Sequence, residues 1–391
     1  MNTDDLYEPR EDSFLLAEQV KKYAHGNVLD MCTGSSIQAM TAAKKKNVRS
    51  VIAVDINKKA LAYAQKKHIT KKIRFLHSDL FSNIKGTFDT IICNPPYLPD
   101  EPRLKDVALD GGKKGYEFTV RFLSSAGPFL KKNCVILLVF SSLTNKPMVD
   151  RLIATNGFVF AQLASQAFDH ETLFVYKIEY PFFVQHFYDS GIRGIKLFAH
   201  GHRGFIFTGL LKNKKVAIKI QRPDTAARGT VAREAAVLKK LNRVGIGPRL
   251  LLTGKNYFAY KFVEGPFIRD FIKTAPPAAI KKMLIDVFHQ MKKLDELGLN
   301  KEEMHHPFKH VIIAKNKQSK QNKPVLIDFE RCKKTAKAHN VTQFCECVAR
   351  MGQELRARGL RVEPEKMRMY AAAYRQNSAV FKELVFYLQR S

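Results

Sequence analysis

Four consecutive residues, Asn94-Pro95-Pro96-Tyr97, have the types needed to hold a planar amide. The two prolines fix their own φ and push Asn94 out of the helical region, so a stiff backbone presents its carbonyl oxygens. The Asn94 side chain and the Pro95 carbonyl can accept two hydrogen bonds from one NH2 group, while the Tyr97 ring packs on its face. A nitrogen held in this way can attack a methyl donor in line. We predict that Asn94, Pro95 and Tyr97 are catalytic; a purely structural Pro-Pro turn is the alternative.

A turn of small residues and two acids stand where a donor molecule could bind. The pattern of Val28–Ser36 predicts a buried strand that enters a tight turn before a helix, and Asp55 and Asp79 end the next two β-rich runs. Ligands of doubly wound sheets bind at the carboxyl ends of strands, where backbone can approach them closely. An acid at the end of a strand is, taken alone, more often a helix N-cap or a loop residue than a ligand-binding one, and a dinucleotide-binding fold would have a similar turn.

A parallel sheet would bring these residues together, and the pattern predicts one. Between Asn27 and about Tyr180, β-rich runs alternate with amphipathic stretches, which is typical of a Rossmann-like α/β domain with a doubly wound, mostly parallel sheet. The last two runs could form a terminal antiparallel pair. The expected strands are 28–31, 50–55, 73–77, 90–93, 135–140 and 173–178.

Residues 1 to about 180 resemble the HemK-like S-adenosylmethionine-dependent glutamine methyltransferases, specifically the short type that modifies class I release factors. The resemblance implies that Asp30 and Gly34 shape the methionine side of the donor site. It also implies that Asp55 binds the ribose, that Asp79 binds the adenine amino group, and that Asn94 borders both donor and acceptor. The matching segments are Tyr7–Ser13 with Leu15-Leu16, Asp30–Ser36, Asp55, Asp79, Asn94–Tyr97, Ala108–Gly112 with Gly115, and Glu171–Leu173.

One departure from that family lies in the donor turn. Cys32 and Ser36 stand where the family usually has glycine. A Cβ at Cys32 narrows the approach of the backbone to the donor, so we expect weakened or reshaped binding. The resemblance further implies a release factor or other translation protein as substrate, and often a small zinc-containing activator subunit.

The second half of the chain has features of a nucleotide pocket. Gly201 and Gly204 outline a glycine-rich phosphate loop that lacks its first glycine. Lys219 ends a Val-Ala-Ile-Lys string typical of a phosphate-binding strand, and Glu234 on the following helix is its expected ion partner. Asp328, in an Ile-Asp-Phe-Glu string, is a candidate Mg²⁺ ligand. This order resembles the RIO-like and lipopolysaccharide-kinase-like atypical kinases, which implies ATP and Mg²⁺ as cofactors.

The segment Met304–Ile313 stands where such a kinase has its catalytic loop. That loop should carry an Asp that orients the substrate hydroxyl and, a few residues later, an Asn for a second Mg²⁺. If His310 takes the place of the Asn, His305 takes that of the Asp, so the segment has neither residue. We therefore expect either an unusual active kinase or a nucleotide-binding pseudokinase, and the histidines are equally compatible with an ordinary polar turn.

Length and charge suggest two domains of different character. The chain has 391 residues and a formal charge of +30, which favours two globular domains. We place them at 1–182 and 183–391, the second an α+β kinase-like domain with a small lobe at about 190–265 and a helical lobe at about 266–391. Residues 1–180 hold 25 basic and 19 acidic side chains (net +6), and 181–391 hold 41 and 17 (net +24). The basic half is therefore expected to contact RNA or the ribosome, although a lysine-rich composition alone would look the same.

Composition also limits the cellular setting. The six cysteines include no CxxC pair, which supports neither a disulfide framework nor a zinc site. No apolar run approaches the roughly 18 to 20 residues that span a bilayer, and the first residues have no apolar signal-peptide core. We predict a cytoplasmic protein without membrane contact.

These features together predict a glutamine N5-methyltransferase of a translation release factor, fused to a kinase or pseudokinase domain. A nucleic-acid N6-adenine methyltransferase could use the same Asn-Pro-Pro-Tyr chemistry on an exocyclic amine, but no separate target-recognition domain remains in the chain. A non-catalytic ribosome- or tRNA-binding adaptor is the third hypothesis.

Overall fold

The computed structural model describes residues 8–67, 70–100, 110–200, 204–221, 230–254, 256–315 and 322–391. These residues form two compact units. Unit 1 runs through residue 200 and includes 207–214, and unit 2 comprises the described residues from 215 onward together with 204–206. Among the described residues, no helix is both long and apolar enough to cross a membrane.

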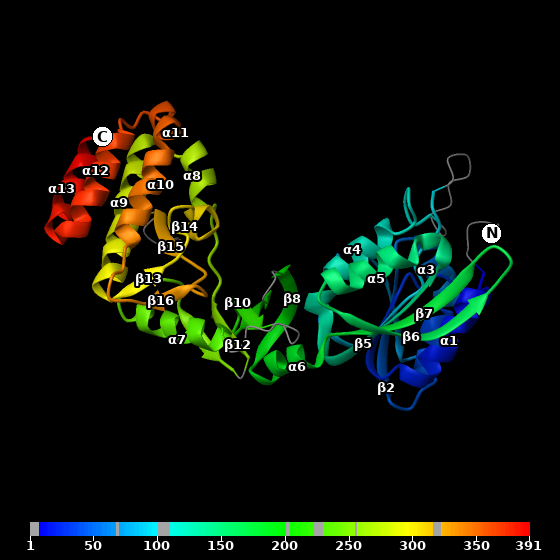
Figure 1. Cartoon of the computed structure of the whole chain (residues 1–391). Coiled ribbons are helices and arrows are strands. Elements are labelled where there is room, and N and C mark those ends of the chain that lie inside the picture. Colours follow the sequence, from blue (N-terminus) through cyan, green and yellow to red (C-terminus); the bar gives the residue numbers. More distant parts are fainter. Residues whose placement is uncertain are drawn as a thin grey trace. The chain divides into compact units, whose positions relative to one another are not determined.

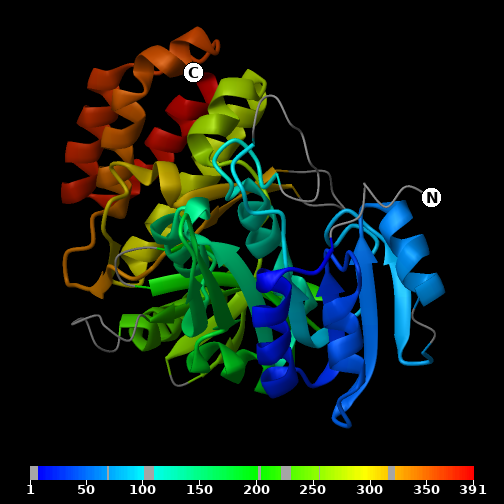
Figure 2. The same ribbon diagram turned by 90° about the vertical axis from the view of Figure 1, so that its right-hand side faces the viewer.

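Unit 1 is built on a seven-stranded sheet in the order β3-β2-β1-β4-β5-β7-β6 (Figures 1 and 2). The first five strands of that order run parallel, and β7 is antiparallel to both β5 and β6. The predicted doubly wound, mostly parallel sheet and the terminal antiparallel pair are confirmed. The strands are β1 (Gly26–Met31), β2 (Val48–Asp55), β3 (Ile73–His77), β4 (Phe88–Cys93), β5 (Leu130–Ser141), β6 (Val159–Ala167) and β7 (Thr172–Glu179).

Helices cover both faces of this sheet, with α1 on one face and α4 and α5 on the other (Figure 1). Leu16 and Val20 of α1 and Ala39 of α2 share one buried core with Val28 and Val51 of the strands. This packing holds the start of α1 against the strands that carry the candidate site. The helices of unit 1 are α1 (Glu11–Tyr23), α2 (Ile37–Ala43), α3 (Lys58–Lys67), α4 (Glu117–Ala126), α5 (Lys146–Thr155) and α6 (Phe182–Asp189).

Unit 1 extends beyond the predicted domain end at residue 182. The hydroxyl of Tyr180 donates to the carbonyl of Ile195 (2.6 Å), and that of Tyr188 donates to the carbonyl of Leu130 (3.0 Å). These buried contacts tie α6 and β8 (Ile192–His200) to the first unit, which also includes residues 207–211 of β9 (Gly204–Leu211). The functional division at 182/183 remains a prediction.

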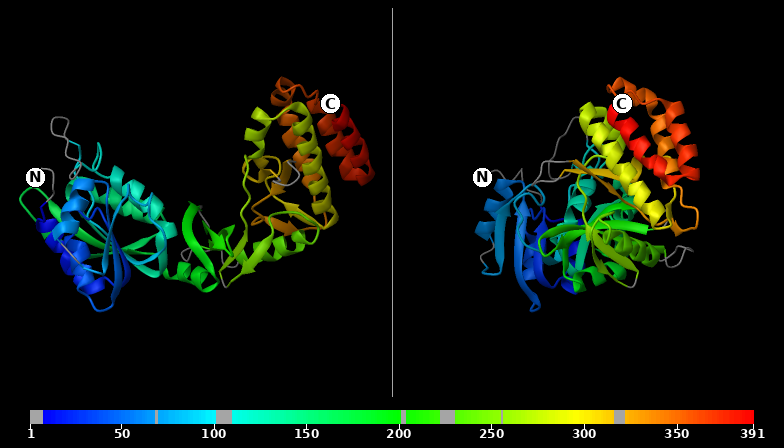
Figure 3. Two further views of the ribbon diagram at one scale, coloured as in Figure 1. Left: turned by 180° about the vertical axis from the view of Figure 1, so that it is seen from behind. Right: turned by 90° about the vertical axis from the view of Figure 1, so that its left-hand side faces the viewer.

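Unit 2 combines a small antiparallel sheet with a helical part. Its strands β10 (Lys214–Gln221), β12 (Tyr257–Lys261) and β11 (Leu250–Thr253) follow one another in the order β11-β12-β10 within a five-stranded sheet, and α7 (Thr230–Asn242) contacts β11 and β12. Helices α9, α10, α12 and α13 pack side by side around one apolar core (Figure 3). The other elements are α8 (Ile268–Thr274), α9 (Pro277–Glu296), α10 (Asn340–Arg350), α11 (Gly352–Ala357), α12 (Pro364–Gln376), α13 (Phe381–Arg390), β13 (Leu299–Lys301), β14 (Val311–Lys315), β15 (Asn322–Leu326) and β16 (Cys332–Lys334).

Candidate functional site

The predicted acceptor segment begins where β4 ends, at the carboxyl edge of the parallel strands. Asn94 donates from Nδ2 to Oδ2 of Asp12 (3.0 Å) and to Oγ of Ser13 (3.3 Å). The hydroxyl of Tyr97 donates to the same oxygen of Asp12 (3.3 Å). Oδ1 of Asn94 is shielded from solvent and receives no hydrogen bond from the described residues. Asn94 thus offers a buried acceptor that an incoming donor would satisfy.

Two glycines let a neighbouring loop pack on the backbone of this segment. A Cβ on Gly111 would lie 2.8 Å from the carbonyl oxygen of Pro96, and one on Gly115 would lie 2.7 Å from that of Tyr97. Gly115 also has a φ of 79°, which side chains disfavour. Gly111 and Gly115 of the predicted motif are therefore required by close approach to the acceptor segment. Outside the described residues lie four residues of the predicted motifs: Tyr7, Ala108, Leu109 and Gly201.

The predicted donor turn follows β1 and is left-handed at three positions. Cys32, Gly34 and Ser36 have φ values of 59°, 48° and 62°. This conformation costs a residue with a Cβ about 1–2 kcal/mol, so Cys32 and Ser36 are strained where glycine would be relaxed. A Cβ built on Gly34 would have nothing within 4 Å, which leaves open space beside the turn.

Asp55 and Asp79 both lie at this edge, but in different surroundings. Oδ2 of Asp55 accepts from the N–H of Gly34 (2.9 Å), so the structure joins the turn to the predicted ribose carboxylate. Asp79 has both oxygens on the Nη2 of Arg121 (2.9 and 2.7 Å), and both side chains are about half exposed. An adenine amino group at Asp79 would have to share that carboxylate with Arg121.

Asp30 is the most deeply buried acid of this edge. Its Oδ2 accepts from Oγ1 of Thr33 (2.6 Å) and from the N–H of Ala39 (2.9 Å), while Oδ1 is buried without a partner among the described residues. Burial outweighs these two hydrogen bonds and raises the pKa of Asp30 to about 7. Asp30 therefore places a buried carboxyl oxygen, without a partner among the described residues, at the donor turn.

In unit 2, the structure brings the predicted nucleotide residues Lys219, Glu234 and Asp328 together. Nζ of Lys219 lies 2.7 Å from Oε2 of Glu234, 2.9 Å from Oδ1 of Asp328 and 3.3 Å from Oε2 of Glu330. Burial alone would lower the pKa of Lys219, but the carboxylates of Glu234 and Asp328 outweigh it and raise that pKa. Burial likewise tends to raise the pKa of Asp328, yet Lys219 lowers it to about 2. Glu234, Asp328 and Glu330 each have one carboxylate oxygen within 4.8 Å of the other two. Such a set of oxygen ligands suits a hard divalent cation.

The segment predicted as a catalytic loop has a carboxylate beside it that the residue pattern did not indicate. Nε2 of His310 lies 3.1 Å from Oε2 of Glu303, and its Nδ1 lies 3.8 Å from Oδ2 of Asp328. His305, assigned to the place of the missing Asp, instead packs its ring on His306 (4.8 Å between centroids). The segment itself has neither the expected Asp nor the Asn, and the carboxylate beside it belongs to Glu303, the residue that precedes it. Glu303 was missed because its spacing from His310 is longer than that of the expected Asp–Asn pair.

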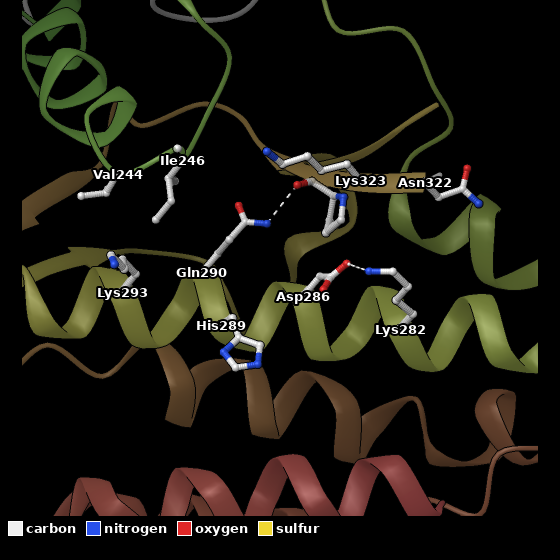
Figure 4. Close-up of a pocket in the computed structure, with 11 residues that line it drawn as sticks. Val244, Ile246, Lys282, Asp286, His289, Gln290, Lys293, Asn322 and Lys323 are labelled. Carbon is white, nitrogen blue, oxygen red and sulfur yellow. Dashed lines mark hydrogen bonds and ion pairs between the residues drawn. The ribbon is translucent and has the colours of Figure 1, made fainter. Parts of the chain in front are cut away.

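A groove on unit 2 lies apart from these residues and is bordered by basic side chains (Figure 4). It has a volume of about 450 Å³ and runs between α9 and the β15 strand, with Lys282, Lys293 and Lys323 on its border. Lys282 pairs with Asp286 (2.9 Å), whereas no ion pair among the described residues involves Lys293 or Lys323. A second groove shares Gly245 with the first and is bordered by three more cations: Lys239, Arg243 and Arg249.

Comparison with known proteins shows which proteins unit 1 is similar to. Residues 11–159 match the Methyltransferase small domain family. A putative protein N5-glutamine methyltransferase of Methanocaldococcus jannaschii is 36% identical over 161 residues, which cover 39% of this chain and 81% of that protein. A ribosomal protein uL3 glutamine methyltransferase of Neisseria meningitidis serogroup A is 34% identical over 125 residues, which cover 29% of this chain and 41% of that enzyme.

Among solved structures, the E. cuniculi Mtq2–Trm112 complex, responsible for methylation of the eRF1 translation termination factor, is similar to this chain. The match has 24% identity and a TM-score of 0.38, and covers 45% of this chain and 99% of that one. The sequence match to most of the archaeal relative is the stronger finding, and by it the chain belongs to the protein N5-glutamine methyltransferase family.

Proposed function

We propose that unit 1 transfers a methyl group from S-adenosylmethionine to the side-chain amide nitrogen of a protein glutamine. The observation that carries the proposal is the unsatisfied, buried Oδ1 of Asn94 at the carboxyl end of β4. An amide NH2 is a donor that fits this acceptor, and family membership supports glutamine as its source.

The residues of the donor edge fit the proposed cofactor. Asp30 has a buried oxygen without a partner among the described residues, Gly34 leaves space beside the turn, and Asp55 adjoins that turn through the Gly34 N–H. S-adenosylmethionine supplies a methyl group on a positively charged sulfur. In this proposal Asp30 and Gly34 hold its methionine part, Asp55 its ribose and Asp79 its adenine.

The protein then acts mainly by positioning. Oδ1 of Asn94 and the carbonyl of Pro95 accept the two N–H groups of the glutamine, and the Tyr97 ring packs on the amide plane. Both hydrogen bonds lie in that plane and fix its orientation, so the nitrogen lone pair, which is perpendicular to the plane, points toward the methyl carbon. The nitrogen takes the methyl group as the bond between that methyl and the donor sulfur breaks, which leaves S-adenosylhomocysteine, and the nitrogen releases one proton to water.

The proposed acceptor is the glutamine of a translation protein, most specifically a Gly-Gly-Gln segment of a release factor. Relatives with release factor and ribosomal protein uL3 specificities support this class, and the chain spans about half or less of those bacterial enzymes. A small zinc-containing activator subunit and a cytoplasmic location belong to the same proposal. The test supplies labelled donor to the full chain with release factor, DNA and total RNA, with and without a Trm112-type subunit. Label in nucleic acid alone would favour the adenine alternative.

We also propose that unit 2 is a kinase-like domain that binds ATP with Mg²⁺. Support comes from Lys219, which contacts three carboxylates, and from the side chains of Glu303 and His310 beside Asp328. In this proposal Lys219 holds phosphates, Asp328 holds the metal, and Gly204 with Gly201 belongs to the phosphate loop. Mg-ATP should raise the melting temperature of the full chain; no stabilisation would contradict nucleotide binding.

A third proposal concerns RNA. The net charge of +24 beyond residue 180 and the two adjoining basic grooves support binding of a polyanion by unit 2. Filter binding at two salt concentrations tests this proposal, because release of counterions makes such affinity fall steeply with salt. Absence of binding at low salt would remove RNA from the partners.

A further inference from the structure

Asp12 contacts both ends of the acceptor segment from a distant part of the chain. It lies in the first turn of α1, 82 residues before Asn94, and only 3% of it is exposed. Its Oδ1 accepts from the backbone N–H of Ser13 (2.6 Å). Its Oδ2 accepts from Nδ2 of Asn94 (3.0 Å) and from the hydroxyl of Tyr97 (3.3 Å). One carboxylate oxygen thus contacts two of the residues assigned to the amide.

This contact determines which end of the Asn94 amide meets the substrate. A carboxylate oxygen without a proton only accepts hydrogen bonds, so the NH2 end of Asn94 must face Asp12. The carbonyl end, Oδ1, then faces the other way, and it is the buried atom without a partner among the described residues. If the amide rotated by half a turn, two oxygens would meet at Asp12 and the pocket would present a donor.

We infer that Asp12 is a positioning residue that makes the pocket accept an amide NH2 and reject a carboxylate. The inference rests on the proposed function of unit 1 and adds its discrimination between glutamine and glutamate. A glutamine NH2 satisfies Oδ1 of Asn94, whereas a glutamate side chain would place an oxygen against it. A buried polar group without a partner is penalised strongly, and such sites reject the mismatched analogue.

The substitution Asp12→Asn tests this role with almost no change of volume. The backbone N–H of Ser13 keeps the carbonyl of the new side chain in the place of Oδ1, so the new NH2 replaces Oδ2. That NH2 can donate to Asn94, which turns the Asn94 carbonyl away from the substrate. Glu11→Gln is the matched control, because it makes the same chemical change at the adjacent, exposed position.

Three measurements on the full chain, with a Trm112-type subunit supplied, define the expected result. Asp12→Asn should lower kcat/KM for a Gly-Gly-Gln peptide by about ten- to a hundred-fold, the effect of one lost buried hydrogen bond. The inhibition constant of the Gly-Gly-Glu peptide should fall relative to the KM of the Gly-Gly-Gln peptide. Affinity for S-adenosylhomocysteine should stay within about twofold of wild type, because Asp12 acts on the acceptor. Glu11→Gln should match wild type throughout.

The reciprocal variant Asp12→Asn with Asn94→Asp gives a readout that loss of stability would not produce. The amide introduced at position 12 can donate to the new carboxylate at position 94, which again presents an acceptor oxygen to the substrate. Partial recovery of glutamine methylation over Asp12→Asn is expected, and no recovery would contradict the inference. If Asp12→Asn fails to fold, the test is the affinity of wild type for the Gly-Gly-Gln and Gly-Gly-Glu peptides. Equal affinity for these two peptides would overturn the inference. If wild type methylates glutamine and Asp12→Asn has the same kinetics, the positioning role of Asp12 is refuted but the proposed function stands. If wild type methylates no glutamine, both the proposed function and this inference are refuted.

Discussion

Replacement of Asp30 by Asn should make unit 1 more stable at neutral and alkaline pH but not in acid. Asp30 is 1% exposed, and the pKa of its side chain is raised from 3.8 to about 7 because burial disfavours the ionised form. Between these two values the unfolded chain has released the proton while the folded chain retains it. Folding stability therefore falls as the pH rises from about 4 to about 7, and the loss is constant above that.

The magnitude follows from the two pKa values. A gap of about 3 pH units at about 1.4 kcal/mol each gives about 4 kcal/mol, as an order of magnitude. Asn cannot ionise, and its oxygen can still accept from Thr33 and Ala39, so Asp30→Asn removes this dependence. Its free energy of unfolding minus that of wild type should rise between about pH 4 and 7 and then stay level.

Hydrogen-exchange mass spectrometry on peptides of β1 measures this difference within unit 1. Wild type and variant are compared at each pH, so the intrinsic exchange rate cancels. Any constant effect of the new amide shifts the whole curve and leaves its slope unchanged. A difference that does not vary between acid and neutral pH would refute the reasoning, because it would mean that burial does not keep Asp30 protonated.

Three further outcomes are expected. Asn94→Ala should abolish methyl transfer but leave donor affinity nearly intact, and Asp55→Ala should do the reverse; calorimetric titration with initial rates checks both, and unchanged turnover in Asn94→Ala would refute the acceptor pocket. Cys32→Gly should bind S-adenosylhomocysteine more tightly, since it removes a Cβ that narrows the approach of the backbone to the donor, and it should also relieve about 1 kcal/mol of left-handed strain in the fold; weaker binding would contradict this. Lys219→Ala should lose any thermal stabilisation by Mg-ATP, while Lys215→Ala, which removes an exposed ion pair with Glu264, should keep it.

Much of unit 1 could be predicted because its signals are local. The buried strands β2 and β4 contain apolar runs, and a site residue stands at the end of each run: Asp55 is the last residue of β2, and Asn94 directly follows β4. Strand β6 was not predicted because most of its residues are exposed, so it lacks the apolar run of a buried strand. It pairs instead at the edge of the sheet, where one neighbour is enough.

The missed site residues share a different cause. Asp12 belongs to the Tyr7–Ser13 segment, but its hydrogen bond with Asn94 joins residues 82 apart in the chain. Nothing in the local residue pattern specifies that contact. Arg121 reaches Asp79 from a helix 42 residues later, where its sequence neighbours give no sign of a partner. Glu303 has a φ of 71°, a backbone turn that changes the spacing of the loop and that no residue-type pattern indicated.

Mass spectrometry of a release factor incubated with the full chain, S-adenosylmethionine and a Trm112-type subunit tests the proposed methyl transfer to glutamine. We expect one added methyl group, located by fragmentation on the side-chain nitrogen of the Gly-Gly-Gln glutamine and absent with the Asn94→Ala variant. Methylation of adenine in DNA or RNA with an unmodified release factor, or glutamine methylation that persists in Asn94→Ala, would contradict it.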